Sequence, residues 1–171
     1  FTGLIVTPSN FVFVNKEGQR FVNEFESRDV LSKAALEQKD GIFYIIADAN
    51  IKALAMNTTE DKINQELEDG TLVKADTLEA LAQKLNIDTT TFVNTIERYN
   101  TFVEQGQDED FNKNAFDLKI EKAPFYATPR KPAIHHTMGG LKINTHVQVI
   151  DVEGHIIEGL YAAGEVAGGI H

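Results

Sequence analysis

An uninterrupted apolar run, Ile42-Phe43-Tyr44-Ile45-Ile46, decides the architecture of this chain. It has the length of a strand, and its lack of alternation between polar and apolar residues indicates a buried strand. A second β-rich run, Phe11-Val12-Phe13-Val14, lies before it. A turn with Gly18 then leads into the extended stretch Arg20-Phe21-Val22, which predicts a hairpin. The first quarter of the chain is therefore expected to be mostly β-structure.

The middle of the chain has the pattern of helices. The predicted helices cover residues 27–36, 58–67, 76–85 and 88–105. Each opens on Ser, Thr or Asp, the residues preferred at helix N-termini, and Gly106 ends the longest one. Its residues Phe92, Ile96, Tyr99 and Val103 follow a 4-3-4 spacing and form one apolar face. Residues 107–119 are polar and acidic and are predicted to be a loop.

The last third changes character. Pro124, Pro129 and Pro132 punctuate extended segments, and strands are expected at 141–143, 147–150 and 160–163, with a turn at Glu153-Gly154. Helices in the middle and strands at both ends form an α+β pattern, because strands and helices do not alternate as in a βαβ fold.

Composition excludes several classes of function. The 171 residues include 26 Asp and Glu against 16 Lys and Arg, so the formal net charge is −10. An average surface of this sign repels nucleic acid and anionic membranes, and no apolar run reaches the length of a membrane helix. The absence of Cys excludes disulfides and thiolate metal sites. No targeting segment is visible, and both ends of the sequence have the look of an excised piece of a longer protein.

Arg28 and the pair His135-His136 are the first candidates for a functional site. Arg28 occupies the first helical position, where the helix dipole disfavours a cation. It is either an exposed Arg with a carboxylate partner, or a guanidinium aimed into a cleft that receives a carboxylate. Neighbouring residues of a strand face opposite ways, so one His of the pair can point to a site. No His-rich helical spacing supports a metal ion there.

Glycines mark the second group of candidates. Gly139-Gly140 either forms a tight turn or lets the backbone come close to a flat ligand or to another chain. Glu165 ends an apolar strand, where a carboxylate can accept hydrogen bonds from ribose-like hydroxyl groups. Neither a Walker A motif nor a GxGxxG motif is present.

These features occur together in an order that is more specific than any one of them. The four motifs are Asn15-Lys16-Glu17-Gly18-Gln19-Arg20-Phe21-Val22-Asn23-Glu24, Ser27-Arg28-Asp29-Val30-Leu31-Ser32, His135-His136-Thr137-Met138-Gly139-Gly140 and Gly159-Leu160-Tyr161-Ala162-Ala163-Gly164-Glu165-Val166-Ala167-Gly168-Gly169-Ile170-His171. The sequence resembles the flavoprotein subunit of the fumarate reductase and succinate dehydrogenase superfamily, in particular its soluble fumarate reductase, flavocytochrome c and urocanate reductase branch.

The resemblance implies a domain division and a role for each candidate. Residues 1–136 would be the substrate-closing capping domain with its β entry segment, and residues 137–171 an incomplete return into the FAD-binding domain. The implied roles are proton donation to the substrate alkene for Arg28, binding of a substrate carboxylate for His135, and cofactor contacts for His136, Gly139, Gly140 and Glu165. No metal is implied.

The implied activity is reduction of the C=C bond of a small unsaturated carboxylate, with hydride from flavin N5 and a proton from Arg28. The expected partners are FAD, a small dicarboxylate or urocanate-like substrate, and the rest of the FAD domain. The isolated chain is expected to bind FAD weakly or not at all and to be inactive. One departure stands out: Leu4 and Thr7 occupy the positions where the superfamily has a Glu and an Arg of its proton relay.

Two alternatives stay open at this point. One is a capping module that only packs or binds a partner, motivated by the missing relay residues. The other is a sibling flavin dehydrogenase, such as an aspartate oxidase or a ketosteroid dehydrogenase. Arg28 and His135 disfavour the steroid branch, because a steroid has no carboxylate for them to bind.

Overall fold

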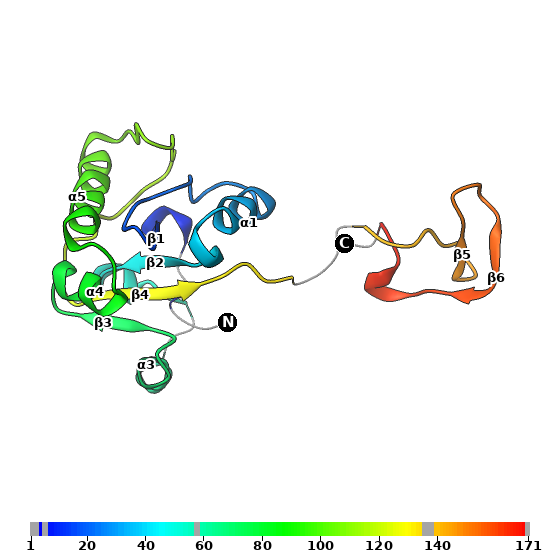
Figure 1. Ribbon diagram of the computed structural model, residues 1–171, viewed down its shortest axis with the longest axis horizontal. Coiled ribbons are helices and arrows are strands. Elements are labelled where there is room, and N and C mark those ends of the chain that lie inside the picture. Colours follow the sequence, from blue (N-terminus) through cyan, green and yellow to red (C-terminus); the bar gives the residue numbers. More distant parts are fainter. Residues whose placement is uncertain (1–3, 5–6, 57–58, 135–138, 170–171) are drawn as a thin grey trace. The chain divides into compact units, whose positions relative to one another are not determined.

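The structure is a computed structural model that describes residues 4, 7–56, 59–134 and 139–169. The chain forms two compact units, Phe1–Pro132 and Ala133–His171, and each is described by itself (Figure 1). The predicted site residues His135 and His136 lie outside the described residues.

The first unit is built on a four-stranded antiparallel sheet. Its strands are β1 (Val12–Asn15), β2 (Phe43–Ala47), β3 (Val73–Ala75) and β4 (Phe125–Arg130), in the order β1-β2-β4-β3. The predicted apolar run is β2, which pairs with β1 through Phe13↔Ile45 and with β4 through Ile45↔Thr128. Ile46 is fully buried, so the expected buried strand is confirmed as an interior strand of the sheet.

Helices fill the middle of the chain, as predicted. They are α1 (Arg28–Leu36), α2 (Ala49–Ala53), α3 (Glu60–Glu68), α4 (Leu78–Leu85) and α5 (Thr89–Gln105), with short 3-10 turns at Pro8–Asn10 and Lys39–Gly41. Thr59, Thr77 and Asp88 cap α3, α4 and α5 through side-chain hydrogen bonds. The capping residue of α4 is therefore Thr77, one position later than the predicted Asp76.

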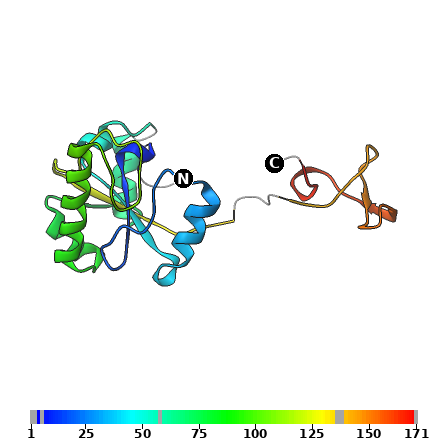
Figure 2. The same ribbon diagram turned by 90° about the horizontal axis from the view of Figure 1, so that it is seen from above.

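Helix α5 supplies much of the core. It runs beside α4 along one side of the sheet (Figures 1 and 2). Its buried residues are Phe92, Ile96, Tyr99 and Phe102. The four predicted residues of this face are confirmed: Phe92, Ile96 and Tyr99 are buried, and Val103 is partly buried and packs against the core. Phe102, which is also buried, lies about 100° around the helix from Val103 and outside the predicted 4-3-4 spacing.

The second unit is a small β-structure. Strands β5 (Gln148–Ile150) and β6 (Ile156–Tyr161) form an antiparallel hairpin, and a 3-10 turn follows at Gly164–Val166. The predicted strand at 141–143 is reduced to two isolated bridges, Leu141↔Ala167 and Ile143↔Val149. The predicted turn at Glu153-Gly154 is present, closed by a hydrogen bond from Gly154 N to Asp151 O.

Two short elements, α2 and β3, were not predicted, because five and three residues carry too little periodicity. The whole is an α+β fold, as expected. Within the described parts of the chain, no helix is long and apolar enough to span a membrane.

Candidate functional site

Arg28 stands at the first position of α1 with its side chain exposed. Ser27 occupies the N-cap position but makes no capping hydrogen bond to the helix backbone. Its hydroxyl instead bonds the Asp29 carboxylate, which lowers the pKa of Asp29 below its usual value. Across the part of the chain that the structure describes, the Arg28 guanidinium has no ion pair. The structure thus shows an exposed Arg28 without an ion pair among the described residues, and the choice between its two readings stays a prediction.

A buried group of charges lies just before Arg28 in the sequence. Arg20 donates from Nε and NH2 to the two carboxylate oxygens of Glu24 at 3.1 and 2.9 Å. It donates from NH1 and NH2 to the carboxylate of Asp108 at 3.2 and 2.8 Å. One guanidinium therefore holds two carboxylates, each in the two-bond geometry that fixes both partners.

Lys113 completes this group, which we call the Arg20 cluster: Arg20, Glu24, Asp108 and Lys113. Lys113 Nζ donates to the carbonyl of Phe11 at 2.7 Å and lies 3.4 Å from Glu24 Oε2. Every member is at most 9% exposed. Two positive and two negative groups make the cluster neutral, which is the condition for burying charges at tolerable cost.

Burial and pairing shift the pKa values of the cluster in definite directions. Burial alone would lower the pKa of Arg20, but its hydrogen bonds to Asp108 and Glu24 outweigh this and raise it. Burial alone would raise the pKa of Asp108, and the hydrogen bond from Arg20 outweighs it, so that pKa falls. Burial lowers the pKa of Lys113 to about 8 and raises that of the neighbouring Tyr99. The ion pair between Arg20 and Asp108 therefore stays charged near neutral pH.

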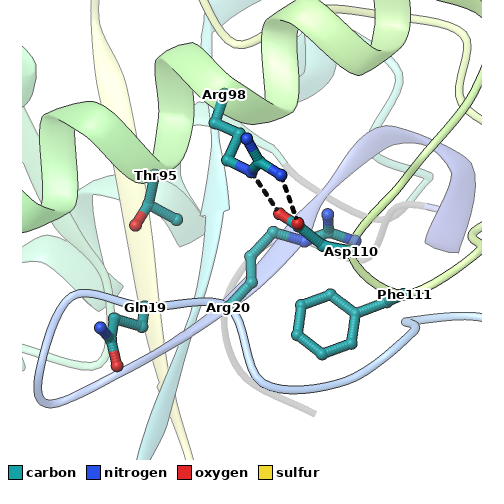
Figure 3. A pocket seen from close by; sticks show the side chains of 6 residues that line it. All are labelled: Gln19, Arg20, Thr95, Arg98, Asp110 and Phe111. Carbon is teal, nitrogen blue, oxygen red and sulfur yellow. Dashed lines mark hydrogen bonds and ion pairs between the residues drawn. The ribbon is translucent and has the colours of Figure 1, made fainter.

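A hollow of about 410 Å³ opens beside the cluster (Figure 3). It is lined by Gln19, Arg20, Thr95, Arg98, Asp110 and Phe111. Arg98 and Asp110 face each other across it in a two-bond ion pair, with both distances 2.7 Å, and the Thr95 hydroxyl donates to Gly18 O. Because its charged groups are paired with one another or within the cluster, the hollow does not present the features of the predicted site.

The second unit brings two of the predicted motifs together. Leu141 N donates to Val166 O at 2.8 Å, and Gly168 N donates to Leu141 O at 2.9 Å. A Cβ on Gly140 would lie 2.4 Å from Val166 O, a distance no side chain can adopt. The backbone at Gly140 therefore lies close against another segment of the same chain, a contact that was not among the predicted readings of this glycine.

Gly139 and Glu165 sit differently. No described atom lies within 4 Å of where a Gly139 Cβ would be, so this position is open. Glu165 is exposed in the 3-10 turn that starts at Gly164, whose φ of 77° suits glycine. Gly139 and Glu165 therefore both lie at the surface of the second unit, whereas the space beside Gly140 is filled by Val166, and the cofactor contacts of these residues stay predictions.

The structure therefore gathers Gly139, Gly140 and Glu165 in one unit, whereas Arg28 belongs to the other. Sequence reasoning missed the Arg20 cluster. Arg20 and Glu24 carried a weak signal, as opposite charges four residues apart around the apolar pair Phe21-Val22. Asp108 and Lys113 carried none, since they stand among many other charges in a stretch that has the composition of a solvated loop. Among the described residues, no group of three or more His, Asp or Glu side chains could hold a metal ion.

Comparison with known proteins places this geometry in a family. The FAD binding domain family matches residues 5–171. The NADH:acrylate oxidoreductase of Vibrio harveyi is 58% identical over 170 residues, which cover 99% of this chain and 17% of that protein. The urocanate reductase of Eggerthella lenta is 38% identical over 177 residues, covering 98% of this chain and 28% of that protein.

A solved structure agrees with these relatives. The open conformation of a flavocytochrome c3 fumarate reductase superposes with a TM-score of 0.79 at 35% identity, covering 98% of this chain and 29% of the other. The chain spans less than a third of the length of each of these three proteins. The predicted flavoprotein family is confirmed: the chain belongs to the FAD binding domain family.

Proposed function

We propose that this chain works as part of an FAD-dependent reductase that saturates the C=C bond of a small unsaturated carboxylate. The observation that carries the proposal is the exposed Arg28 at the start of α1, without an ion pair in the described structure. The match to the FAD binding domain family and the names of the relatives, which refer to acrylate and urocanate, support the reaction class.

Within this proposal, the first unit is the capping domain that closes over the substrate, and the second returns into the FAD domain. Bound FAD supplies the hydride. Arg28 delivers a proton from a guanidinium nitrogen to the alkene carbon that does not receive the hydride. Its positive charge also stabilises the negative charge that builds toward the substrate carboxylate. His135 binds that carboxylate, while His136, Gly139, Gly140 and Glu165 contact the cofactor.

We further propose an acrylate-like monocarboxylate as the substrate. Leu4 is 3% exposed and packed in the core of the first unit, and the Thr7 hydroxyl is engaged with Ser9 at 2.8 Å. These two positions therefore offer neither a carboxylate nor a cation, where the superfamily pattern has one of each. Because those two residues belong to the proton relay, their replacement does not select a substrate; the proposal of acrylate is supported by the Vibrio harveyi relative, which is 58% identical and is named for acrylate.

The test uses the FAD-loaded protein that contains this chain, with reduced methyl viologen as electron donor and acrylate, fumarate or urocanate as acceptor. We expect the highest kcat/KM with acrylate. Arg28→Lys should keep the flavin content and lose most of the turnover, because Lys retains the charge but not the planar fork. Arg98→Lys, a change at another exposed Arg of the first unit, is the matched control and should keep turnover. Near-normal alkene reduction by Arg28→Lys would exclude Arg28 as the proton donor.

A further inference from the structure

The placement of Arg28 is not explained by α1 itself. In this helix only Ala35 is buried, and residues 28–30 are exposed. The Ser27 side chain makes no capping bond to the first turn. Leu31 and Ala34 pack against the core, but the exposed residues 28–30 do not, so the position of Arg28 also depends on the segment that leads into the helix.

That leading segment is tightly held. Glu24 is 1% exposed, and besides the two bonds from Arg20 it accepts a hydrogen bond from Phe13 N at 3.1 Å. Asn23 shapes the turn that follows, because its Oδ1 accepts from Phe25 N at 2.9 Å and its carbonyl accepts from Glu26 N at 3.1 Å. Only three residues separate the anchored Glu24 from Arg28.

The other half of the Arg20 cluster orders the loop around Asp108. The Asp108 carboxylate accepts hydrogen bonds from the backbone N–H groups of Asp110, Phe111 and Lys113 at 3.1, 3.3 and 3.3 Å. The Asn23 side chain also reaches this loop, donating to the carbonyl of Asn112 at 3.4 Å. The acidic loop after α5 and the turn before α1 are thus joined through one buried guanidinium.

We infer that the Arg20 cluster is the device that positions Arg28 for proton donation, with Glu24 and Asp108 as positioning residues. The inference rests on the proposed function. A carboxylate that accepts three or more hydrogen bonds is fixed in position. Because a single turn connects Glu24 to Arg28, fixing Glu24 also restricts the position of Arg28. A proton donor must be held within a fraction of an ångström of its productive geometry, so a rigid support behind it controls the rate.

The experiment compares two carboxylates of the same loop in the FAD-loaded protein. Asp108→Asn removes a buried partner of Arg20, whereas Asp110→Asn breaks only the exposed pair with Arg98. We expect Asp108→Asn to lower kcat for acrylate reduction by about 10- to 100-fold, with KM changed by less than about threefold. Asp110→Asn should stay within about twofold of the unchanged protein.

A second variant guards against misfolding, because removing one partner of a buried ion pair is strongly destabilising. Asn23→Ala leaves every buried charge paired. It removes only the two side-chain hydrogen bonds of Asn23, one to the carbonyl of Asn112 in the Asp108 loop and one from Phe25 N in the turn before α1. It should lower kcat about two- to tenfold with an unchanged melting temperature. An unchanged kcat in Asn23→Ala and in folded Asp108→Asn would overturn the inference.

Two further readouts separate positioning from general damage. In an Arg28→Lys background, Asp108→Asn should cost little additional rate, because the group it positions is already gone. Hydrogen exchange of the amides of residues 25–31 should accelerate in Asp108→Asn and not in Asp110→Asn. Multiplicative rate losses, or exchange unchanged in this segment, would contradict the positioning role. If Arg28→Lys is inactive while the cluster variants are fully active, the inference alone fails; if the unchanged protein reduces no alkene, the proposed function fails and the inference with it.

Discussion

The two units of this chain differ in how they are stabilised. The first has a continuous core that includes Ile46, Phe92, Ile96 and Tyr99, all fully buried, and a neutral cluster of buried charges. In the second, Val149, Ala162 and Ala167 are the buried apolar residues among those described, and every residue of β6 is exposed. A two-stranded hairpin with so little apolar burial is at best marginally stable. The first unit therefore has enough apolar burial to fold from its own contacts, whereas the second has too little and needs further contacts to be stable.

Separating the units is the strongest test of this difference. A polypeptide of residues 1–132 should show helical circular dichroism and a cooperative thermal transition. A polypeptide of residues 133–171 should show neither, because its burial cannot offset the loss of chain entropy. Circular dichroism during a temperature scan distinguishes the two. A cooperative melt of the second polypeptide would refute the comparison.

Truncation of core side chains should also separate them. Phe92→Ala removes a fully buried ring and should lower the unfolding free energy of the first unit by about 3–5 kcal/mol. Leu160→Ala in β6, where the side chain is 43% exposed, should leave that transition unchanged. Urea denaturation followed by circular dichroism measures both. Equal losses would mean that the two units fold as one cooperative block.

Gly140 and Gly139 sharpen the comparison inside the second unit. Gly140→Ala forces a Cβ against Val166 O and should disrupt this unit at a cost of about 1–3 kcal/mol, lowering the FAD content of the protein that contains the chain. Gly139→Ala enters open space and should be nearly neutral for folding. The flavin-to-protein absorbance ratio of the purified variants is the measurement. Equal ratios for both variants would show that the segment crossing at Gly140 does not matter for the cofactor.

The smallest effect expected is a pH dependence of the first unit that comes from Lys113. Its pKa of about 8 in the folded state lies below its ordinary value of 10.5, so between these values the unfolded chain binds a proton that the folded chain does not. The unfolding free energy should therefore rise with pH from about 8 to 9.5, by about 1–2 kcal/mol from this residue.

The control for this slope is Lys113→Met, which should abolish it while leaving Arg20 paired with Glu24 and Asp108. Urea titrations at pH 7.5, 8.5 and 9.5 measure the effect. The range stops below pH 10, because the raised pKa of Tyr99 introduces an opposite trend there. A slope that persists in Lys113→Met would assign the effect to another group.

The sequence predicted much of the first unit and little of what holds it together. The run at 42–46, the cap at Asp88 and the stop at Gly106 are local signals, and each was read correctly, whereas the cap of α3 was left open between Thr58 and Thr59 and is Thr59. The Arg20 cluster joins residues 88 positions apart, from Arg20 to Asp108, and no local pattern records such a contact. In the second unit the prediction of a strand at 141–143 was wrong, because these residues form only one isolated bridge to each of two different segments.

For the site, too, local signals were predicted and contacts between distant residues were not. Motif order identified the family, and the helix start at Arg28 was placed at the right residue. The reason for Gly140 was left open between a turn, a flat ligand and another chain; its close contact is instead with Val166 of the same chain, 26 residues further on, which no local pattern indicates. The roles of Arg28, His135, His136, Gly139, Gly140 and Glu165 stay predictions.

The close contact between Gly140 and Val166 determines where the segment between them can tolerate insertions and deletions. Leu141 and Gly168 are tied by hydrogen bonds at the two ends of the segment that contains β5 and β6. The segment between them is therefore a loop whose two ends are held side by side. Its turn at Asp151–Gly154 can therefore gain or lose residues in the course of evolution without altering the spatial relation between the two glycine motifs, because the crossing, not the length of the hairpin, sets that relation.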